Sequence, residues 1–372
     1  MAFGDRILVQ ARNYSVQVEG LAAAELNRNL SDYLPPNYAT RKMAEAYGGY
    51  ARRRTNTNDE YLLLRQTFTE TRSKSHQVFS SVIADHVPSE KYNLARSMFE
   101  VADQPNTIRS AVRSLNRTGM WKAKFSIPPK LVESLRDKVL TRMESLHGDK
   151  LTNILKGSPE APPQIKSNFS WVTSFGEMYE VAADPLLLTI VHQYMGVPPI
   201  FDVPVAFVNS NVPVSAKDLS DTAQLYHHDM YRLGFVKLFM YLTDVGPKDG
   251  PHAMIPGTHR ERPDALWNDG RHTDEKVAEH GLLDQEERIT GPSGTLFLVD
   301  TSALHKGVHP EENYRVLAQV QYANSLFGHP IADAGRPFTA ARKSDDPDVL
   351  AAADLVKTYA EKVGVRFMQG MI

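Results

Sequence analysis

The spacing of apolar residues along the first third of the chain is helical. Through residues 58–87, leucine, phenylalanine and valine recur three or four positions apart, which is typical of an amphipathic helix. A similar pattern over residues 89–102 follows Ser89, a residue type that commonly caps a helix. The pattern therefore predicts an α-rich extension over residues 1–125.

Two later segments carry start and stop signals for helices. Residues 126–150 open with a serine and two prolines, continue with apolar positions three or four apart, and reach a glycine near the end. Residues 184–196 begin with Asp184 and end at Gly196, shortly before a pair of prolines that cannot continue a helix. We expect a helix in each segment.

After Gly196 the pattern becomes that of β-strands. Short segments of alternating or continuous apolar residues are separated by glycine, proline and aspartate. These segments are residues 200–212, 222–229, 233–245, 252–255, 294–300 and 314–325. They favour an antiparallel β-sandwich or barrel over alternating β–α–β units.

Two further stretches differ from this β pattern. A polar, charged stretch over residues 260–290 interrupts the strands and is interpreted as a helical or loop insertion. Residues 345–364 predict a terminal helix. The chain thus divides into an extension (1–125), a core with its preceding helices (126–330) and a helical tail (331–372).

Composition limits the chemistry and the partners. The 42 basic and 44 acidic residues nearly balance, so nothing attracts the whole chain to nucleic acid or to an anionic membrane. The absence of cysteine leaves histidine and carboxylate side chains to carry any metal chemistry. The first residues lack the features of a secretory signal, and no apolar run reaches the roughly 18 residues that span a bilayer. We expect a cytoplasmic protein that binds neither nucleic acid nor membrane.

A candidate metal site begins where two histidines and an aspartate precede an apolar strand. Side chains alternate along a strand, so His227 and Asp229 point to one side and His228 to the other. His305 follows a second apolar strand, 76 residues beyond Asp229. Two histidines and one carboxylate form a facial triad that leaves positions open on non-haem iron(II), although they also suit catalytic zinc. A lone His-x-Asp is more often a surface or hydrogen-bonded pair.

The succession of motifs around these residues resembles a known family. The segments YHHD, DGPHAMIPGTHR, GTLFLVDTSALHKG and YRVLAQVQY follow one another as in the phytanoyl-CoA dioxygenase family of Fe(II)/2-oxoglutarate-dependent oxygenases. The resemblance covers about residues 180–325. It implies an α+β fold whose core is a double-stranded β-helix, the cupin-like jelly roll, with flanking helices.

The resemblance also implies ligands and cosubstrates. His227, Asp229 and His305 resemble the iron ligands of the family, and no catalytic residue is implied beyond them. The cosubstrates would be 2-oxoglutarate and O₂. The reaction would oxidise an unactivated C–H bond of a small-molecule metabolite, most simply by hydroxylation, with release of succinate and CO₂.

Other candidate contacts follow from the same comparison. Arg315, ten residues past His305, resembles the arginine that binds the distal carboxylate of 2-oxoglutarate. Lys237 interrupts an apolar strand, so its side chain points either inward to a carboxylate or outward to solvent. Gln224 is a further candidate for the cosubstrate. The candidates for the substrate are Tyr231, Arg232 and Asn209.

Several alternatives stay open from the sequence. The same iron chemistry could desaturate or cyclise the substrate, and a cupin-like enzyme could use the metal without 2-oxoglutarate. A zinc hydrolase would fit the ligands, but no HExxH motif supports it, and a metal-free interaction protein would not need the complete ligand set. Halogenases of the family replace the carboxylate ligand by a small residue, so Asp229 favours oxygenation. The extension and the 260–290 insertion are candidates for lids, specificity elements or a homodimer interface.

Overall fold

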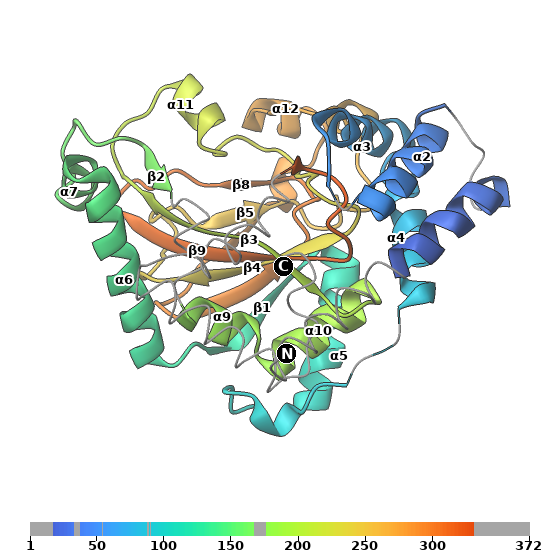
Figure 1. Ribbon diagram of the computed structural model, residues 1–372. Helices are drawn as coiled ribbons and strands as arrows, with labels where there is room; N and C mark the ends of the chain where they lie inside the picture. The colour runs from blue at the N-terminus through green and yellow to red at the C-terminus, as the bar shows by residue number, and fades with distance from the viewer. Residues whose placement is uncertain are drawn as a thin grey trace.

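The computed structural model describes residues 18–32, 38–53, 55–87, 89, 91–166 and 176–330. Within these ranges, antiparallel sheets lie among helices that cover them from outside (Figure 1). This mixed α and antiparallel β architecture is the one predicted. The predicted tail helix over 345–364 lies outside the described residues. None of the described helices is long and apolar enough to cross a lipid bilayer.

The larger sheet has six strands, and each neighbouring pair is antiparallel. In spatial order they are β1 (Met120–Ser126), β7 (Thr295–Val299), β4 (Phe235–Tyr241), β9 (Arg315–Ala323), β3 (Ile200–Asn209) and β2 (Gln164–Lys166). The central strands β4 and β9 are buried along their whole length. Such strands are covered on both faces, which explains their continuous apolar runs.

The smaller sheet contains β6 (Glu287–Ile289), β5 (His252–Met254) and β8 (His305–Gly307). The extended segment around His227 adds to its free edge through a single bridge to His305. Residues 222–229 were predicted as a strand, but they begin at the end of α11 (Ala216–Asp221) and form only isolated bridges. The segment that carries His227 and Asp229 is therefore held at the edge of the smaller sheet rather than within it.

Side-chain alternation on the larger sheet separates two apolar cores. On β4, Val236, Leu238 and Met240 pack against the covering helices, while Phe239 and Tyr241 pack between the two sheets. The covering helices are α5 (Gln104–Thr118), α6 (Pro129–His147), α7 (Asp149–Leu155), α9 (Gly176–Ala182) and α10 (Pro185–Met195). Lys237 shares the inward face with Phe239, so the strand directs it between the sheets.

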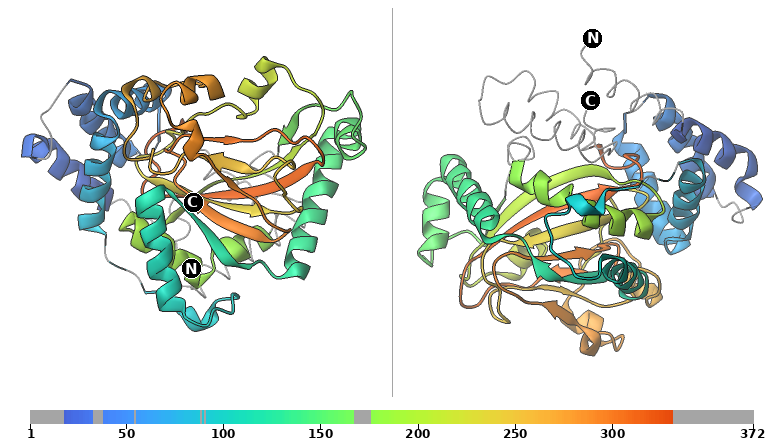
Figure 2. Two further views of the ribbon diagram at one scale, coloured as in Figure 1. Left: turned by 180° about the vertical axis from the view of Figure 1, so that it is seen from behind. Right: turned by 90° about the horizontal axis from the view of Figure 1, so that it is seen from below.

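The N-terminal helices form a third core beside the sheets (Figure 2). A helix over residues 18–32 is followed by α2 (Tyr38–Arg53), α3 (Asn58–Thr71) and α4 (Lys74–His86). The predicted helical run 58–87 is thus two helices, because Arg72 and Ser73 have φ of 50° and 64° and break the backbone pattern. This left-handed pair reorients α4 relative to α3.

The predictions for α6 and α10 are confirmed. The Asp184 carboxylate caps α10 by accepting a hydrogen bond from Leu186 N–H at 2.8 Å, and Gly196 ends the helix with a φ of 74°. The strand β1 was not predicted, and it crosses the predicted boundary at residue 125 by pairing with β7. The core sheet therefore begins before residue 126.

The helix predicted over residues 89–102 is wrong. Of the described residues in this range, only Leu94–Arg96 form a helical element, the short 3₁₀ turn η1. The Asp184 carboxylate accepts hydrogen bonds from Ser97 Oγ at 2.9 Å and from Met98 N–H at 2.7 Å. These long-range bonds hold the backbone out of a helix, so tertiary contacts override the local pattern.

The 260–290 insertion consists of short helical turns and loops, as predicted, and ends in β6. Its turns are η2 (Asp264–Leu266), α12 (Asp274–Ala278) and η3 (Leu283–Gln285). Leu266 and Val277 pack with Tyr226, Ile255 and Leu304 in a small separate core. The insertion therefore covers the outer side of the smaller sheet.

Candidate metal centre and its pocket

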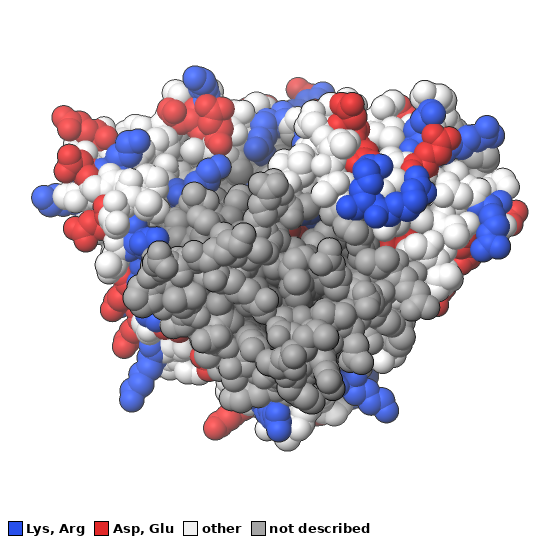
Figure 3. All heavy atoms as spheres, viewed as in Figure 1, with Lys and Arg blue, Asp and Glu red and all other residues white. Residues whose placement is uncertain are grey.

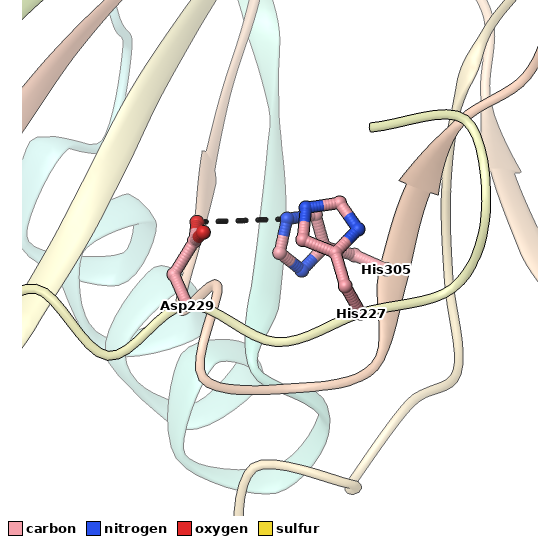
Figure 4. A group of neighbouring side chains, drawn as sticks. All are labelled: His227, Asp229 and His305. Carbon is pink, nitrogen blue, oxygen red and sulfur yellow. Dashed lines mark ion pairs between the residues drawn. The ribbon is translucent and has the colours of Figure 1, made fainter. Parts of the chain in front are cut away.

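Backbone hydrogen bonds bring together three side chains that are far apart in the sequence. The N–H groups of His227 and His305 each donate to the other residue's carbonyl, at 3.0 and 2.9 Å. Asp229 N–H donates to the Thr301 carbonyl at 2.8 Å. The two segments are thus fixed in register, and His227, Asp229 and His305 point toward one another (Figure 4).

The cluster has the dimensions of a metal site. One possible ligand atom from each of the three residues lies within 4.8 Å of the others. The imidazole centroids of His227 and His305 are 4.2 Å apart, and His305 Nε2 is 3.6 Å from Asp229 Oδ2. All three residues are buried. It is the one group of this kind found within the described ranges.

The histidine tautomers are set by the backbone. Nδ1 of His227 lies 2.9 Å from the Leu225 carbonyl, and Nδ1 of His305 lies 2.9 Å from the Ala303 carbonyl. A carbonyl oxygen can only accept, so each Nδ1 carries the proton and each Nε2 keeps its lone pair. Such a second hydrogen bond is how ligand histidines are oriented toward a metal.

The charge states also suit a divalent cation. Burial lowers the pKa of both histidines, and the neighbouring His305 lowers that of His227 further. Burial alone would raise the pKa of Asp229, but Lys237 and the two histidines lower it well below its usual range. Two neutral imidazoles and one carboxylate are the donor set of a facial triad, so the residues fit iron(II).

Lys237 points inward, toward the carboxylate of the cluster. Its Nζ donates to Asp229 Oδ2 at 2.7 Å and lies 5.2 Å from the centre of the Tyr231 ring. Both side chains of this ion pair are buried, each about nine-tenths removed from solvent. Of the two orientations left open by the sequence, the structure has the inward one.

Arg315 lies on the inward face of β9 at one end of the space between the sheets. Its Nη1 donates to the Gly250 carbonyl, and Nη2 donates to Asn209 Oδ1 at 3.0 Å. A Cβ on Gly307 would lie 3.3 Å from Arg315 Nη2. Because Gly307 is two residues past His305 on β8, the guanidinium lies close to the His227–Asp229–His305 cluster.

Several buried polar atoms around Arg315 have no hydrogen-bond partner among the described residues. They are Arg315 Nε, Asn209 Nδ2, His252 Nε2 and both amide atoms of Gln224. The His252 ring lies 5.5 Å from that of His305, between the metal cluster and Arg315. Leaving such groups unpaired is costly, and together they would satisfy a polar ligand with carboxylate oxygens.

The sequence of the central region matches one family model. The model describes phytanoyl-CoA dioxygenase and matches residues 163–309. This part of the chain belongs to the phytanoyl-CoA dioxygenase family. Together with the His227–Asp229–His305 cluster, the match makes the protein an Fe(II)- and 2-oxoglutarate-dependent oxygenase. The family, enzyme class and cofactors predicted from the sequence are thereby confirmed.

The chain also has a low similarity to several solved structures. HygX from Streptomyces hygroscopicus, with nickel and 2-oxoglutarate bound, has 17% identity and a TM-score of 0.43, over 59% of this chain and 88% of that one. The epimerase SnoN from nogalamycin biosynthesis has 16% identity and a TM-score of 0.42, over 59% and 81%. AviO1 from Streptomyces viridochromogenes Tue57 has 14% identity and a TM-score of 0.41, over 60% and 96%. No curated protein matches the chain. These scores are too low to carry the assignment, which rests on the family match.

On the opposite side of the metal cluster from Arg315, a helix of the N-terminal extension reaches this oxygenase's site. Tyr61 of α3 lies 4.5 Å from His329, between ring centres, and Tyr231 lies 5.7 Å from the same ring. Tyr231 lies near the cluster, because Lys237 Nζ is 5.2 Å from its ring centre and donates to Asp229. The negative charge of Asp229 raises the pKa of Tyr231 and adds to the effect of burial on the pKa of Tyr61. Arg65 Nη1 donates to Tyr61 Oη at 2.7 Å. Tyr61 has no motif around it, and sequence reasoning missed it.

Two residues beside the metal ligands face elsewhere. Arg232 is almost completely buried and pairs with Asp202 through Nε and Nη2 at 2.7 and 3.1 Å. This pair occupies the guanidinium, so we remove Arg232 from the candidate substrate contacts. His228 stacks on Phe68 with ring centres 5.5 Å apart, on the side away from the cluster.

Proposed function

We propose that this oxygenase hydroxylates an unactivated C–H bond of a small molecule, with His227, Asp229 and His305 as the iron ligands. The observation that supports it most strongly is the buried cluster whose two imidazoles keep Nε2 free beside an ionised carboxylate. Bound iron would supply the activation of O₂. One oxygen atom would enter succinate as 2-oxoglutarate loses CO₂, and the other would enter the substrate.

We also propose that the two sheets form a double-stranded β-helix. Strands β3, β4, β7 and β9 of the larger sheet alternate along the chain with elements of the smaller sheet. The segment at His227 lies between β3 and β4, the strands β5 and β6 lie between β4 and β7, and β8 lies between β7 and β9. Repeated crossing between two antiparallel sheets is how a jelly roll is wound. The metal cluster would then sit between the sheets, near one end.

For 2-oxoglutarate, we propose the pocket between the metal cluster and Arg315. Arg315 Nε, Asn209 Nδ2 and Gln224 Nε2 are buried donors there that have no partner within the described ranges. A dicarboxylate needs a fixed cation at its distal end, which Arg315 would supply. Lys237 would contact the cosubstrate near the metal, since it already faces the Asp229 carboxylate.

For the substrate, we propose the opposite side of the cluster, where Tyr61 and Tyr231 approach Asp229. The extension would then contribute to substrate specificity through α3. On the face shown in Figure 3, basic and acidic side chains of the described residues are interspersed, which gives no preference for a large charged partner. A cytoplasmic location and a homodimer stay predictions.

Product mass tests the outcome of the reaction. After a screen of small metabolites for succinate release, hydroxylation predicts a product heavier by one oxygen atom. A product lighter by two hydrogen atoms would mean desaturation or ring closure instead. An unchanged mass with succinate release would point to epimerisation. The His227→Ala variant is the control, because it should release no succinate with any substrate.

A further inference from the structure

A second cavity borders the chain segment that carries His227 and Asp229. It is a groove of about 1580 Å³ lined by α4, the end of α10 and residues 256–264. The three metal ligands are absent from its described lining. Phe68, which lines the groove, stacks on His228, whereas His227 and Asp229 point toward His305 (Figure 4). Different side chains of one segment thus face the groove lining and the metal pocket.

The groove carries an excess of positive charge. Lys74, Arg117 and Arg260 are exposed at its rim and Arg262 is buried within it, and none of the four has an ion pair with a described carboxylate. Arg260 donates only to the neutral amide of Asn116, at 2.8 Å. These cations are spread over three separate parts of the chain that meet only in the folded protein.

The acidic residues of the lining are mostly occupied elsewhere. Asp264 pairs with Arg72 at 2.7 Å. Asp300 accepts hydrogen bonds from Tyr194 Oη at 2.5 Å and Ser302 Oγ at 2.6 Å. Asp300 offsets part of the charge of Arg262 without contacting it, and Glu261 is exposed at the rim. The net charge toward the groove therefore stays positive.

Arg262 is the residue that most needs a ligand. It is only 8% exposed, and its guanidinium stacks on Trp267 at 3.9 Å from the ring centre. Nη1 donates to the Ser302 carbonyl at 3.0 Å, but Nε and Nη2 are buried and have no acceptor in the part of the chain that the structure describes. A buried charged donor without an acceptor is costly, and burial lowers the pKa of Arg262 to about 9. Nε and Nη2 form the edge of a guanidinium that binds two oxygens of one oxyanion.

We propose that this groove is a second binding site, for a small molecule that carries phosphate or carboxylate groups. Arg262 binds one oxyanion with Nε and Nη2, held flat by Trp267 and fixed by Ser302. Lys74, Arg117 and Arg260 at the rim bind further negative groups of the same ligand, since the groove is far larger than a single ion. The proposal does not depend on the chemistry at the metal centre.

Calorimetric titration of the full chain with inorganic pyrophosphate tests the site, with tricarballylate as the carboxylate probe. Metal is left out because pyrophosphate binds iron. The structure predicts one site whose affinity falls with added salt. Arg262→Gln removes the charge and the bidentate edge, so the affinity should fall about tenfold to a hundredfold. The tighter of the two probes identifies the preferred oxyanion.

Arg315→Gln is the matched control, because it removes the cation of the other pocket. The proposal predicts that this variant binds pyrophosphate like the wild type. Binding that is lost in Arg315→Gln and kept in Arg262→Gln would overturn it, as would a lack of binding by both probes. If circular dichroism shows that Arg262→Gln does not fold, the exposed pair Lys74→Gln and Arg260→Gln replaces it. That double variant should weaken binding at least about fivefold, and unchanged binding would overturn the proposal.

Discussion

Removing the guanidinium of Arg315 should weaken 2-oxoglutarate binding selectively. Two of its nitrogens already donate to Gly250 and Asn209, and Nε is the donor for which the described residues offer no partner. Arg315→Gln therefore removes one charged hydrogen bond to the cosubstrate together with the positive charge. Such a bond contributes about 1.5–3 kcal/mol. Since about 1.4 kcal/mol is a factor of ten, the KM for 2-oxoglutarate should rise roughly tenfold to 150-fold.

The assay is succinate release at varied 2-oxoglutarate, with iron and substrate saturating. Because Arg315 binds the distal end of the cosubstrate, kcat should fall much less than kcat/KM. Arg315→Lys is the control: it keeps a charge but not the planar edge, so its KM should lie between those of the wild type and Arg315→Gln. A folded Arg315→Gln variant with a KM within about twofold of the wild type would refute the reasoning, because the predicted loss is at least tenfold.

Three further predictions concern the metal ligands and their surroundings. His227→Ala should abolish iron binding, measured by metal analysis after gel filtration. His228→Ala should keep iron binding and lose about 1–3 kcal/mol of stability, because the ring contact with Phe68 is removed. Iron loss in both variants would contradict the assignment. Lys237→Met leaves the buried Asp229 carboxylate unpaired, so the free energy of unfolding of the metal-free protein, measured in urea, should fall by about 3–5 kcal/mol. The fall should be smaller when iron(II) neutralises Asp229. Equal losses with and without metal would argue against Asp229 as a ligand. Tyr61→Phe should leave iron and 2-oxoglutarate binding unchanged and raise the KM for the substrate, and a variant with wild-type kinetics would remove α3 from the substrate site.

The metal cluster could be predicted because its members stand in motifs that resemble the phytanoyl-CoA dioxygenase family, His227 and Asp229 in YHHD and His305 after an apolar strand. Strand alternation by itself was not enough, since a lone His-x-Asp is more often a surface or hydrogen-bonded pair and residues 222–229 form only isolated bridges in the described structure. The orientation of Lys237 could not be predicted, since an inward lysine on a buried strand needs a carboxylate whose position only the fold supplies. Asp229 is eight residues away on the chain and faces Lys237 only because its segment joins the opposite sheet.

Several features that the sequence did not reveal depend on distant partners. Residues 97–98 satisfy a helical pattern, yet the carboxylate of Asp184 holds them in another conformation. Tyr61 reaches the site from a helix with an ordinary amphipathic pattern, and Arg262 stands in a charged loop that the sequence marks only as an insertion. In each case the neighbour that gives the residue its role comes from another part of the chain.

The most direct test of the account is anaerobic titration of the protein with Fe(II) and then 2-oxoglutarate. If His227, Asp229 and His305 hold iron beside a 2-oxoglutarate pocket, a weak visible charge-transfer band should appear only when both are present. The band should be absent in Asp229→Ala and should need much more 2-oxoglutarate in Arg315→Gln. A wild-type protein that binds iron but shows no band at saturating 2-oxoglutarate would contradict the central claim.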